Sequence, residues 1–173
     1  FKQEYQHYLL FFLIGFTAII CQVIYIREFM VVFYGNELTI GFTIAMWLFW
    51  TACGSISTNR LIKKFKRTIK LLRSFLIFIA LFSPLTVLFI RLGKFLFSNV
   101  SGEILGPFPI SLISGLILFP ICFLIGGLFT LAASEFIKDP AQSTGTVYKY
   151  EAIGSAVGGV IFSIILIELF NPF

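Results

Sequence analysis

Long apolar runs separated by short polar connectors are the feature that most constrains how this chain can fold. Of its 173 residues, 58% are hydrophobic and only 12% are charged, and the mean hydropathy is +0.99. A soluble domain of this size carries charge on about a quarter of its residues. The composition therefore excludes an ordinary soluble fold and predicts that lipid surrounds most of the chain.

The pattern predicts an all-α fold, a polytopic integral membrane helical bundle that forms one domain over residues 1–173. About 20 apolar residues cross the core of a bilayer, and the runs are near that length. Proline inside two of the runs indicates kinked helices, because a bilayer does not accommodate open strands. We expect about five transmembrane helices, at residues 8–34, 38–58, 74–90, 108–133 and 152–170.

The distribution of lysine and arginine predicts the orientation of the bundle. With the N-terminus inside, ten of the 13 cations lie on the inner side and only Arg91 and Lys94 lie on the outer side. A basic inner loop at residues 60–73 holds seven of the inner cations, which suit anionic lipid headgroups at about 1 kcal/mol each. Lipid-headgroup contact, and not nucleic acid, is expected for Arg60, Lys63, Lys64, Lys66, Arg67, Lys70 and Arg73.

Two charged residues, Arg27 and Glu28, interrupt the first apolar run. At about 1.5 Å per residue, Arg27 lies roughly 28 Å from the start of the run, close to the outer interface of a core about 30 Å thick. The favoured interpretation is that these side chains extend to the lipid headgroups. The alternative is a polar functional patch that includes Gln22 and Glu37. Glu151, directly before the last run, is assigned to the membrane interface.

Small residues in apolar helices mark surfaces where two helices can approach closely. The last run contains Gly154-Ser-Ala-Val-Gly158 followed by Gly159, and the fourth run contains Gly126 and Gly127. The sequence therefore predicts helix packing at these glycines, with the second, fourth and fifth runs at the tight centre of the bundle. The Phe-rich faces of the first and third runs are expected to contact lipid or a partner protein.

No complete active site is recognisable in the sequence. It lacks the glycine-rich motifs of phosphate-binding and dinucleotide-binding loops, a nucleophile elbow, and a cluster of histidines and carboxylates. His7 is the only histidine, which excludes a haem held by two histidines of this chain. We therefore expect no catalytic residue, no metal site and no cofactor held by this chain alone.

Several short motifs of the chain recur in one known family. Residues 22–60 contain a Gln…Arg-Glu-Phe stretch, a Tyr-Gly-Asn-Glu-Leu turn and a Gly-Ser pair before the basic loop, formed by Gln22, Arg27, Glu28, Phe29, Tyr34, Gly35, Asn36, Glu37, Leu38, Gly54 and Ser55. Farther on come Gly126-Gly127-Leu128-Phe129 and, within residues 145–159, Tyr148, Glu151, Gly154 and Gly158. These motifs resemble the membrane domain of bacterial fused spermidine synthase-like proteins, also described as transporter/spermidine synthase fusions. Thr130 departs from that family, which often has proline there.

The resemblance implies a polyamine-related membrane protein of the bacterial inner (cytoplasmic) membrane. The resemblance does not assign a catalytic role to any residue of this sequence. In that family the aminopropyltransferase activity belongs to a soluble domain that uses decarboxylated S-adenosylmethionine, and the glycine-rich acidic motif of that domain does not occur in residues 1–173.

The first hypothesis about function is a non-catalytic membrane subunit or membrane domain that anchors or assembles a larger complex. Its partners would be anionic membrane lipids and other membrane subunits or a second copy of itself. The second hypothesis is a transport module for a polyamine or another small solute, which needs polar residues along a pathway. The third is the membrane half of an aminopropyltransferase whose catalytic domain is not in this chain.

Overall fold

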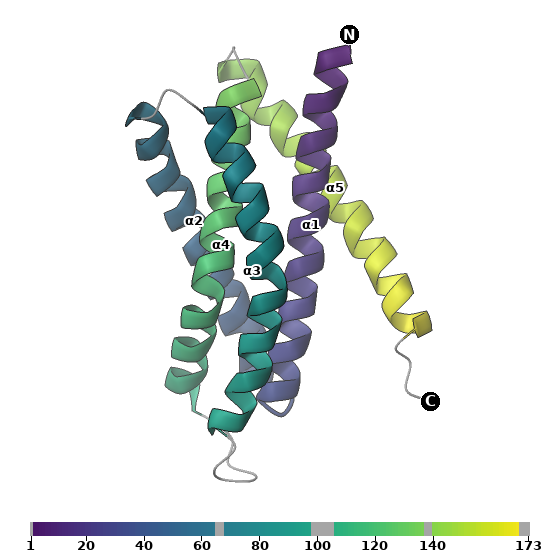
Figure 1. Ribbon diagram of the computed structural model, residues 1–173. Coiled ribbons are helices and arrows are strands. Elements are labelled where there is room, and N and C mark those ends of the chain that lie inside the picture. The colour runs from purple at the N-terminus through teal and green to yellow at the C-terminus, as the bar shows by residue number, and fades with distance from the viewer. Residues whose placement is uncertain (1, 65–67, 98–105, 137–139, 170–173) are drawn as a thin grey trace. The chain divides into compact units, whose positions relative to one another are not determined.

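The computed structural model describes residues 2–64, 68–97, 106–136 and 140–169. Over these residues it contains five α-helices and no strands (Figure 1). The predicted all-α fold is therefore confirmed. The helices are α1 (Lys2–Val32), α2 (Glu37–Lys64), α3 (Thr68–Phe97), α4 (Pro107–Phe136) and α5 (Pro140–Leu169).

Four of these helices are long and apolar enough to cross a membrane, which makes the chain a multi-pass membrane protein. They are α1 over Tyr8–Val32, α2 over Glu37–Lys64, α3 over Ile69–Gly93 and α4 over Pro107–Ser134. The described part of α5 is not among them. A fifth span at residues 152–170 stays a prediction.

The connection between α1 and α2 is a tight hairpin. Tyr34 and Gly35 both have positive φ angles, 55° and 75°, and the Gly35 N–H donates to the Met30 carbonyl at 2.8 Å. This six-to-one hydrogen bond ends α1 in the manner of a Schellman motif. Asn36 Oδ1 then accepts the Leu38 N–H at 3.0 Å and caps α2, whose first turn begins with Glu37.

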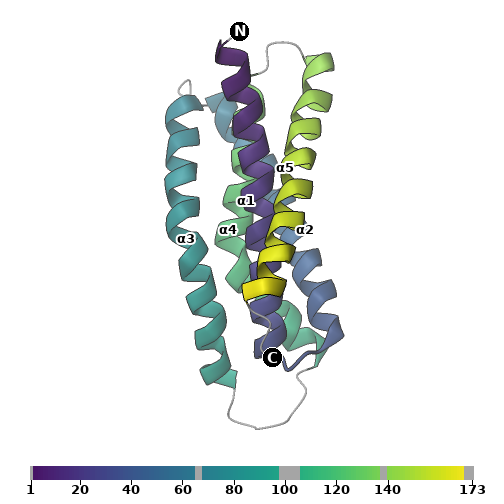
Figure 2. The same cartoon turned by 90° about the vertical axis from the view of Figure 1, so that its right-hand side faces the viewer.

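The chain packs as two compact units. Unit 1 consists of Phe1–Val23 and Ala132–Phe173, and unit 2 consists of Ile24–Leu131. Unit 1 therefore contains α5 and the first two thirds of α1, which lie beside one another (Figure 2). Unit 2 contains the end of α1 with α2, α3 and most of α4.

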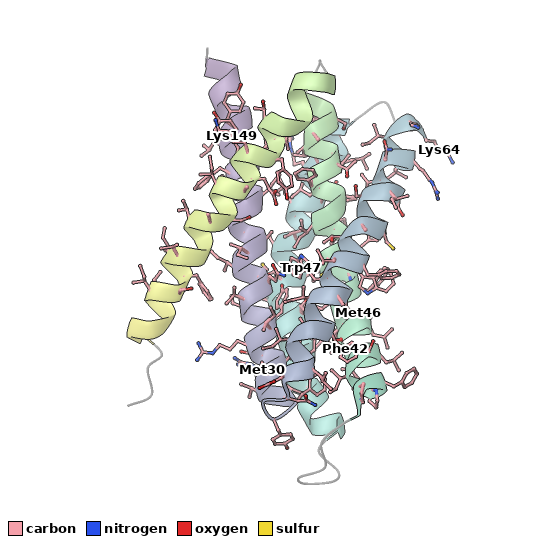
Figure 3. The ribbon with its side chains drawn as sticks, turned by 180° about the vertical axis from the view of Figure 1, so that it is seen from behind. Met30, Phe42, Met46, Trp47, Lys64 and Lys149 are labelled. Carbon is pink, nitrogen blue, oxygen red and sulfur yellow. The ribbon has the colours of Figure 1, made fainter. Side chains whose placement is uncertain are left out.

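The core of unit 2 is built around aromatic side chains of α1 and α2. Tyr25 and Phe29 of α1 are fully buried, and Trp47 of α2 turns into the interior (Figure 3). The ring centroids of Tyr25 and Trp47 are 6.3 Å apart, and the Tyr25 hydroxyl donates to the Ser83 carbonyl of α3 at 3.3 Å. These contacts hold three helices together around one apolar centre.

The expected exposure of the Phe-rich faces is correct for α3 and wrong for α1. Phe78 and Phe89 of α3 are exposed, whereas Phe11 and Phe29 of α1 are buried. The apolar run alone does not show whether a Phe side chain is buried in the bundle or exposed on its surface, because a helix that is apolar all round can be buried in protein or surrounded by lipid.

Candidate functional site

Glu28 of α1 and Arg91 of α3 form a two-point ion pair in unit 2. Arg91 Nε donates to Glu28 Oε2 at 2.8 Å, and Arg91 Nη2 donates to Glu28 Oε1 at 2.6 Å. Both residues lie within the apolar spans Tyr8–Val32 and Ile69–Gly93, near the end of each. The planar guanidinium matches the carboxylate in this forked geometry, so the pair fixes the spacing of the two helices.

The sequence interpretation assigned Glu28 to lipid headgroups and did not pair it with Arg91. A signal for the pair exists in the sequence. The first and third runs cross the bilayer in the same direction, so charges near the end of both runs lie at a similar depth. The sequence does not show, however, that α1 and α3 are neighbours at this point.

The other polar residues of the predicted patch do not share one environment. Arg27 and Glu37 belong to unit 2 and are exposed, and Glu37 begins α2, where a carboxylate is favoured by the helix dipole. Gln22 belongs to unit 1 and is half-buried. A common polar site of these residues stays a prediction.

The helices α2 and α4 meet backbone to backbone at two glycines, which we call the α2–α4 seam. A Cβ atom on Gly54 would overlap the Phe123 carbonyl, and a Cβ atom on Gly126 would overlap the Thr51 carbonyl. Each helix thus offers a glycine and, three residues earlier, the carbonyl that the opposite glycine contacts. Such close approach allows weak Cα–H···O contacts between the two backbones.

Polar side chains bridge the same two helices on both sides of the seam. The Trp50 indole Nε1–H donates to the Gly115 carbonyl at 2.8 Å, and the hydroxyls of Ser55 and Thr130 share a hydrogen bond of 2.8 Å. The Thr130 hydroxyl also donates to the Gly126 carbonyl at 3.1 Å. Threonine at this position therefore makes an interhelical bond that the proline of the resembled family could not make.

Gly127 packs on the neighbouring face of α4. A Cβ atom there would press on the Thr58 hydroxyl of α2 and the Phe75 ring of α3. The two adjacent glycines thus have different nearest neighbours: those of Gly126 belong to Thr51 of α2, whereas Gly127 lies between α2 and α3.

Unit 1 repeats this arrangement between α1 and α5, which we call the α1–α5 seam. A Cβ atom on Gly154 would overlap the Phe12 carbonyl, and a Cβ atom on Gly15 would overlap the Glu151 carbonyl. The Ser155 hydroxyl adds a hydrogen bond of 3.1 Å to the Gly15 carbonyl. The carbonyl again precedes the glycine by three residues on each helix.

The remaining glycines of α5 contact α1 less tightly. A Cβ atom on Gly158 would lie 2.9 Å from an Ile19 methyl and 3.0 Å from the Phe16 ring, whereas one on Gly159 would meet Ile19 at an ordinary 3.8 Å. The sequence prediction of a tight centre did not include α1. Gly15 was missed because it has no small residue four positions away and its partner lies on another helix.

Aromatic residues flank the α1–α5 seam at one end. The rings of Tyr8 and Tyr150 stack with centroids 4.4 Å apart, and Lys149 Nζ lies 6.0 Å from the centroid of the Tyr150 ring. Glu151, the next residue, is half-buried, and its carbonyl faces Gly15. This group combines rings and polar tips, as residues of a membrane interface do.

The basic segment lies on the ends of two long helices. Arg60, Lys63 and Lys64 are exposed in the last turns of α2, where cations are favoured by the helix dipole (Figure 3 labels Lys64). Lys70 and Arg73 are exposed in the first turns of α3. The other two cations assigned to lipid headgroups, Lys66 and Arg67, lie outside the described residues.

Within the described residues, no three His, Cys, Asp or Glu side chains gather as a metal site would require. The contacts described above are contacts of helix packing and charge pairing. The resemblance to the membrane domains of spermidine synthase-like proteins rests on the sequence motifs alone. No protein-family model, no curated protein and no solved structure matches this chain.

Proposed function

We propose that this chain is a membrane domain that anchors and assembles a larger complex without carrying out catalysis itself. The observation that carries the proposal is the pair of reciprocal glycine seams, α2–α4 and α1–α5. At both seams the helices are joined by backbone contact, which leaves their large apolar side chains free to face outward. Each unit built in this way presents an apolar outer surface.

The outer surface supports this assignment. Ile77 and Leu81 of α3 and Val160 of α5 expose 65%, 57% and 60% of their surface. In a membrane such side chains contact lipid, helices of another subunit or a second copy of the chain. From the motifs of residues 22–60, we further propose a relation to the spermidine synthase-like membrane domains. We also propose a location in the bacterial inner membrane with the N-terminus inside.

The placement of the charged side chains favours assembly over transport. A transport pathway needs polar side chains that remain available to a solute. The Glu28 carboxylate already accepts two hydrogen bonds from Arg91, and Arg27 and Glu37 are on the exterior. Two classes of variant therefore separate the hypotheses, one that disrupts a seam and one that removes polar groups.

To test this, the variants are expressed from the natural gene. Two quantities are measured for each variant: the size of the complex on native gels and the uptake of spermidine by the cells. Gly126→Leu should dissolve the complex, whereas Gly41→Leu, with nothing within 4 Å among the described residues, should leave it intact. Arg27→Gln and Glu37→Gln should change neither readout. Loss of uptake in these two polar variants, with complex size unchanged, would favour a transport module instead.

A further inference from the structure

Glu151 occupies a packing position of α5. Val147, Glu151, Gly154 and Gly158 follow one another at helical spacings and therefore share one face of the helix. Val147 is only 1% exposed, and Gly154 and Gly158 are buried where they contact α1. A carboxyl group thus stands in a row of small and apolar residues that forms the packed face of α5 in unit 1.

The main chain holds Glu151 against α1. Its carbonyl contacts Gly15 directly and is one of the two carbonyls that close the α1–α5 seam. The Ser155 hydroxyl, one turn further along α5, donates to the Gly15 carbonyl at 3.1 Å. The Glu151 side chain is half-buried in this position, so a full hydration shell around its carboxyl group requires α5 to move away from α1 at this point.

No opposite charge balances Glu151 among the described side chains of unit 1, which are those of residues 8–23, 132–134 and 145–165. Lys149 is the only other charged residue in these ranges. It is exposed, its Nζ lies 6.0 Å from the centroid of the Tyr150 ring, and residues two apart do not face each other on a helix. The ionisable residues at positions 2–7 and 135–139 are not among the described side chains. The other titratable groups in the described ranges are three phenols and one thiol, those of Tyr8, Tyr148, Tyr150 and Cys21.

Burial raises the pKa of the Glu151 carboxyl above its usual range. The folded protein therefore keeps this proton at pH values at which the unfolded chain has lost it. The resulting stabilisation is largest below the ordinary glutamate pKa of about 4.3, and it decreases as the pH rises to the pKa of the folded state. A neutral carboxyl group fits a packed seam, whereas an ionised one needs water or a cation.

We propose that Glu151 is a proton-binding site that controls the α1–α5 seam. The seam is closed while the carboxyl group holds its proton, and loss of the proton moves this part of α5 away from α1. Glu28 in unit 2 is different, because its carboxylate is paired with Arg91. The switch concerns packing within unit 1 and does not depend on the assembly role proposed above.

Thermal unfolding of the full chain in detergent measures the effect of the proton on stability. Glu151→Gln keeps a neutral side chain of the same shape at every pH. Its unfolding midpoint should exceed that of the wild type by a few degrees at about pH 8 and approach it at about pH 4. Glu37→Gln removes an exposed carboxylate at the start of α2 and is the matched control, which should show no such gain. A difference between Glu151→Gln and the wild type that is the same at both pH values would contradict the proposal.

Spin labels report the movement of the helices. Leu9 of α1 and Ile153 of α5 are exposed, so both can be replaced by labelled cysteines in a chain without the native cysteines. The distance between the labels, measured by electron paramagnetic resonance, should lengthen from about pH 4 to about pH 8 and stay constant when Glu151→Gln is added. Equal lengthening in both chains would assign the movement to another titrating group, and a constant distance in both would show that the seam stays closed. Either result overturns the proposal. If Glu151→Gln does not fold, Glu151→Ala takes its place in both measurements.

Discussion

Gly54 of α2 lies directly against the backbone carbonyl of Phe123 of α4, with no side chain between the two helices. Gly126 of α4 returns the same contact to Thr51 of α2. The arrangement recurs in unit 1, where Gly15 and Gly154 have the same roles. Each crossing therefore closes by reciprocal contact of main chains, and any side chain at these glycines must push the helices apart.

The α2–α4 seam predicts that Gly54→Ala destabilises the protein although alanine is the better helix former. The added methyl must displace the Phe123 backbone, and overpacking of this kind costs about 1–3 kcal/mol. Gly41→Ala in the same helix is the control, since nothing lies within 4 Å of its new Cβ among the described residues. Thermal unfolding in detergent, followed by circular dichroism, should show a lower midpoint for Gly54→Ala only. Equal midpoints for the two variants would refute the seam.

The α1–α5 seam predicts that Gly154→Ala moves α5 away from α1 at the Tyr8–Tyr150 contact. The stacked rings of Tyr8 and Tyr150 give a local probe of this contact. In a background without the native cysteines, Tyr8→Cys and Tyr150→Cys should be joined efficiently by a short thiol crosslinker. Adding Gly154→Ala should lower the yield severalfold, whereas Gly145→Ala, at an open position of α5, should not. An unchanged yield with Gly154→Ala would show that the seam does not hold α5 in place.

Two buried hydroxyls of α2 predict that replacing them with methyl groups does not destabilise the protein. Thr39 and Thr43 are fully buried, and their Oγ1 atoms have no hydrogen-bond partner within the described part of the chain. Thr39→Val and Thr43→Val keep the side-chain shape and remove an unsatisfied group, so we expect a change between zero and about 1 kcal/mol of stabilisation. The control is Thr86→Val in α3, whose hydroxyl donates to the Phe82 carbonyl at 2.8 Å. It should destabilise by about 1 kcal/mol in the same unfolding assay. Destabilisation by Thr43→Val of the same size as the control would mean that its hydroxyl has a partner.

The hydrogen bond from Trp50 to Gly115 predicts a modest loss in Trp50→Phe. Phenylalanine keeps an aromatic ring beside Phe119, which lies 4.6 Å from Trp50 by ring centroids, but it has no N–H to donate. Interhelical hydrogen bonds in membranes contribute about 0.6–2 kcal/mol, and the loss should fall in that range. The free energy of unfolding in SDS titration measures it. A variant as stable as the wild type would show that the bond contributes nothing.

The sequence predicts where the helices lie along the chain better than it predicts which helices pack against one another. Long apolar runs suffice to locate α1 to α4, because the bilayer imposes length and hydrophobicity on every span. Gly35 and Asn36 likewise predict the hairpin, because glycine readily adopts the positive φ that ends a helix and asparagine caps the helix that follows. Local chemistry of this kind is readable without knowing the rest of the molecule.

Pairing between helices is not local, and there the sequence is insufficient. Gly15 is one small residue in a long apolar helix, and only the position of Glu151 on another helix gives it a role. The bond between Glu28 and Arg91 depends in the same way on which helices are neighbours. Glycine motifs identify a surface that can be approached closely, but they do not name the helix that approaches it.

The most direct test of the assembly role is the native mass of the full natural protein, extracted from its own membrane in mild detergent. The proposal predicts a particle that contains this chain together with further subunits, or further copies, in fixed stoichiometry. It also predicts that the particle is lost in Gly126→Leu and kept in Gly41→Leu. A particle with one copy of the protein alone, which carries out solute transport when reconstituted into liposomes, would contradict it.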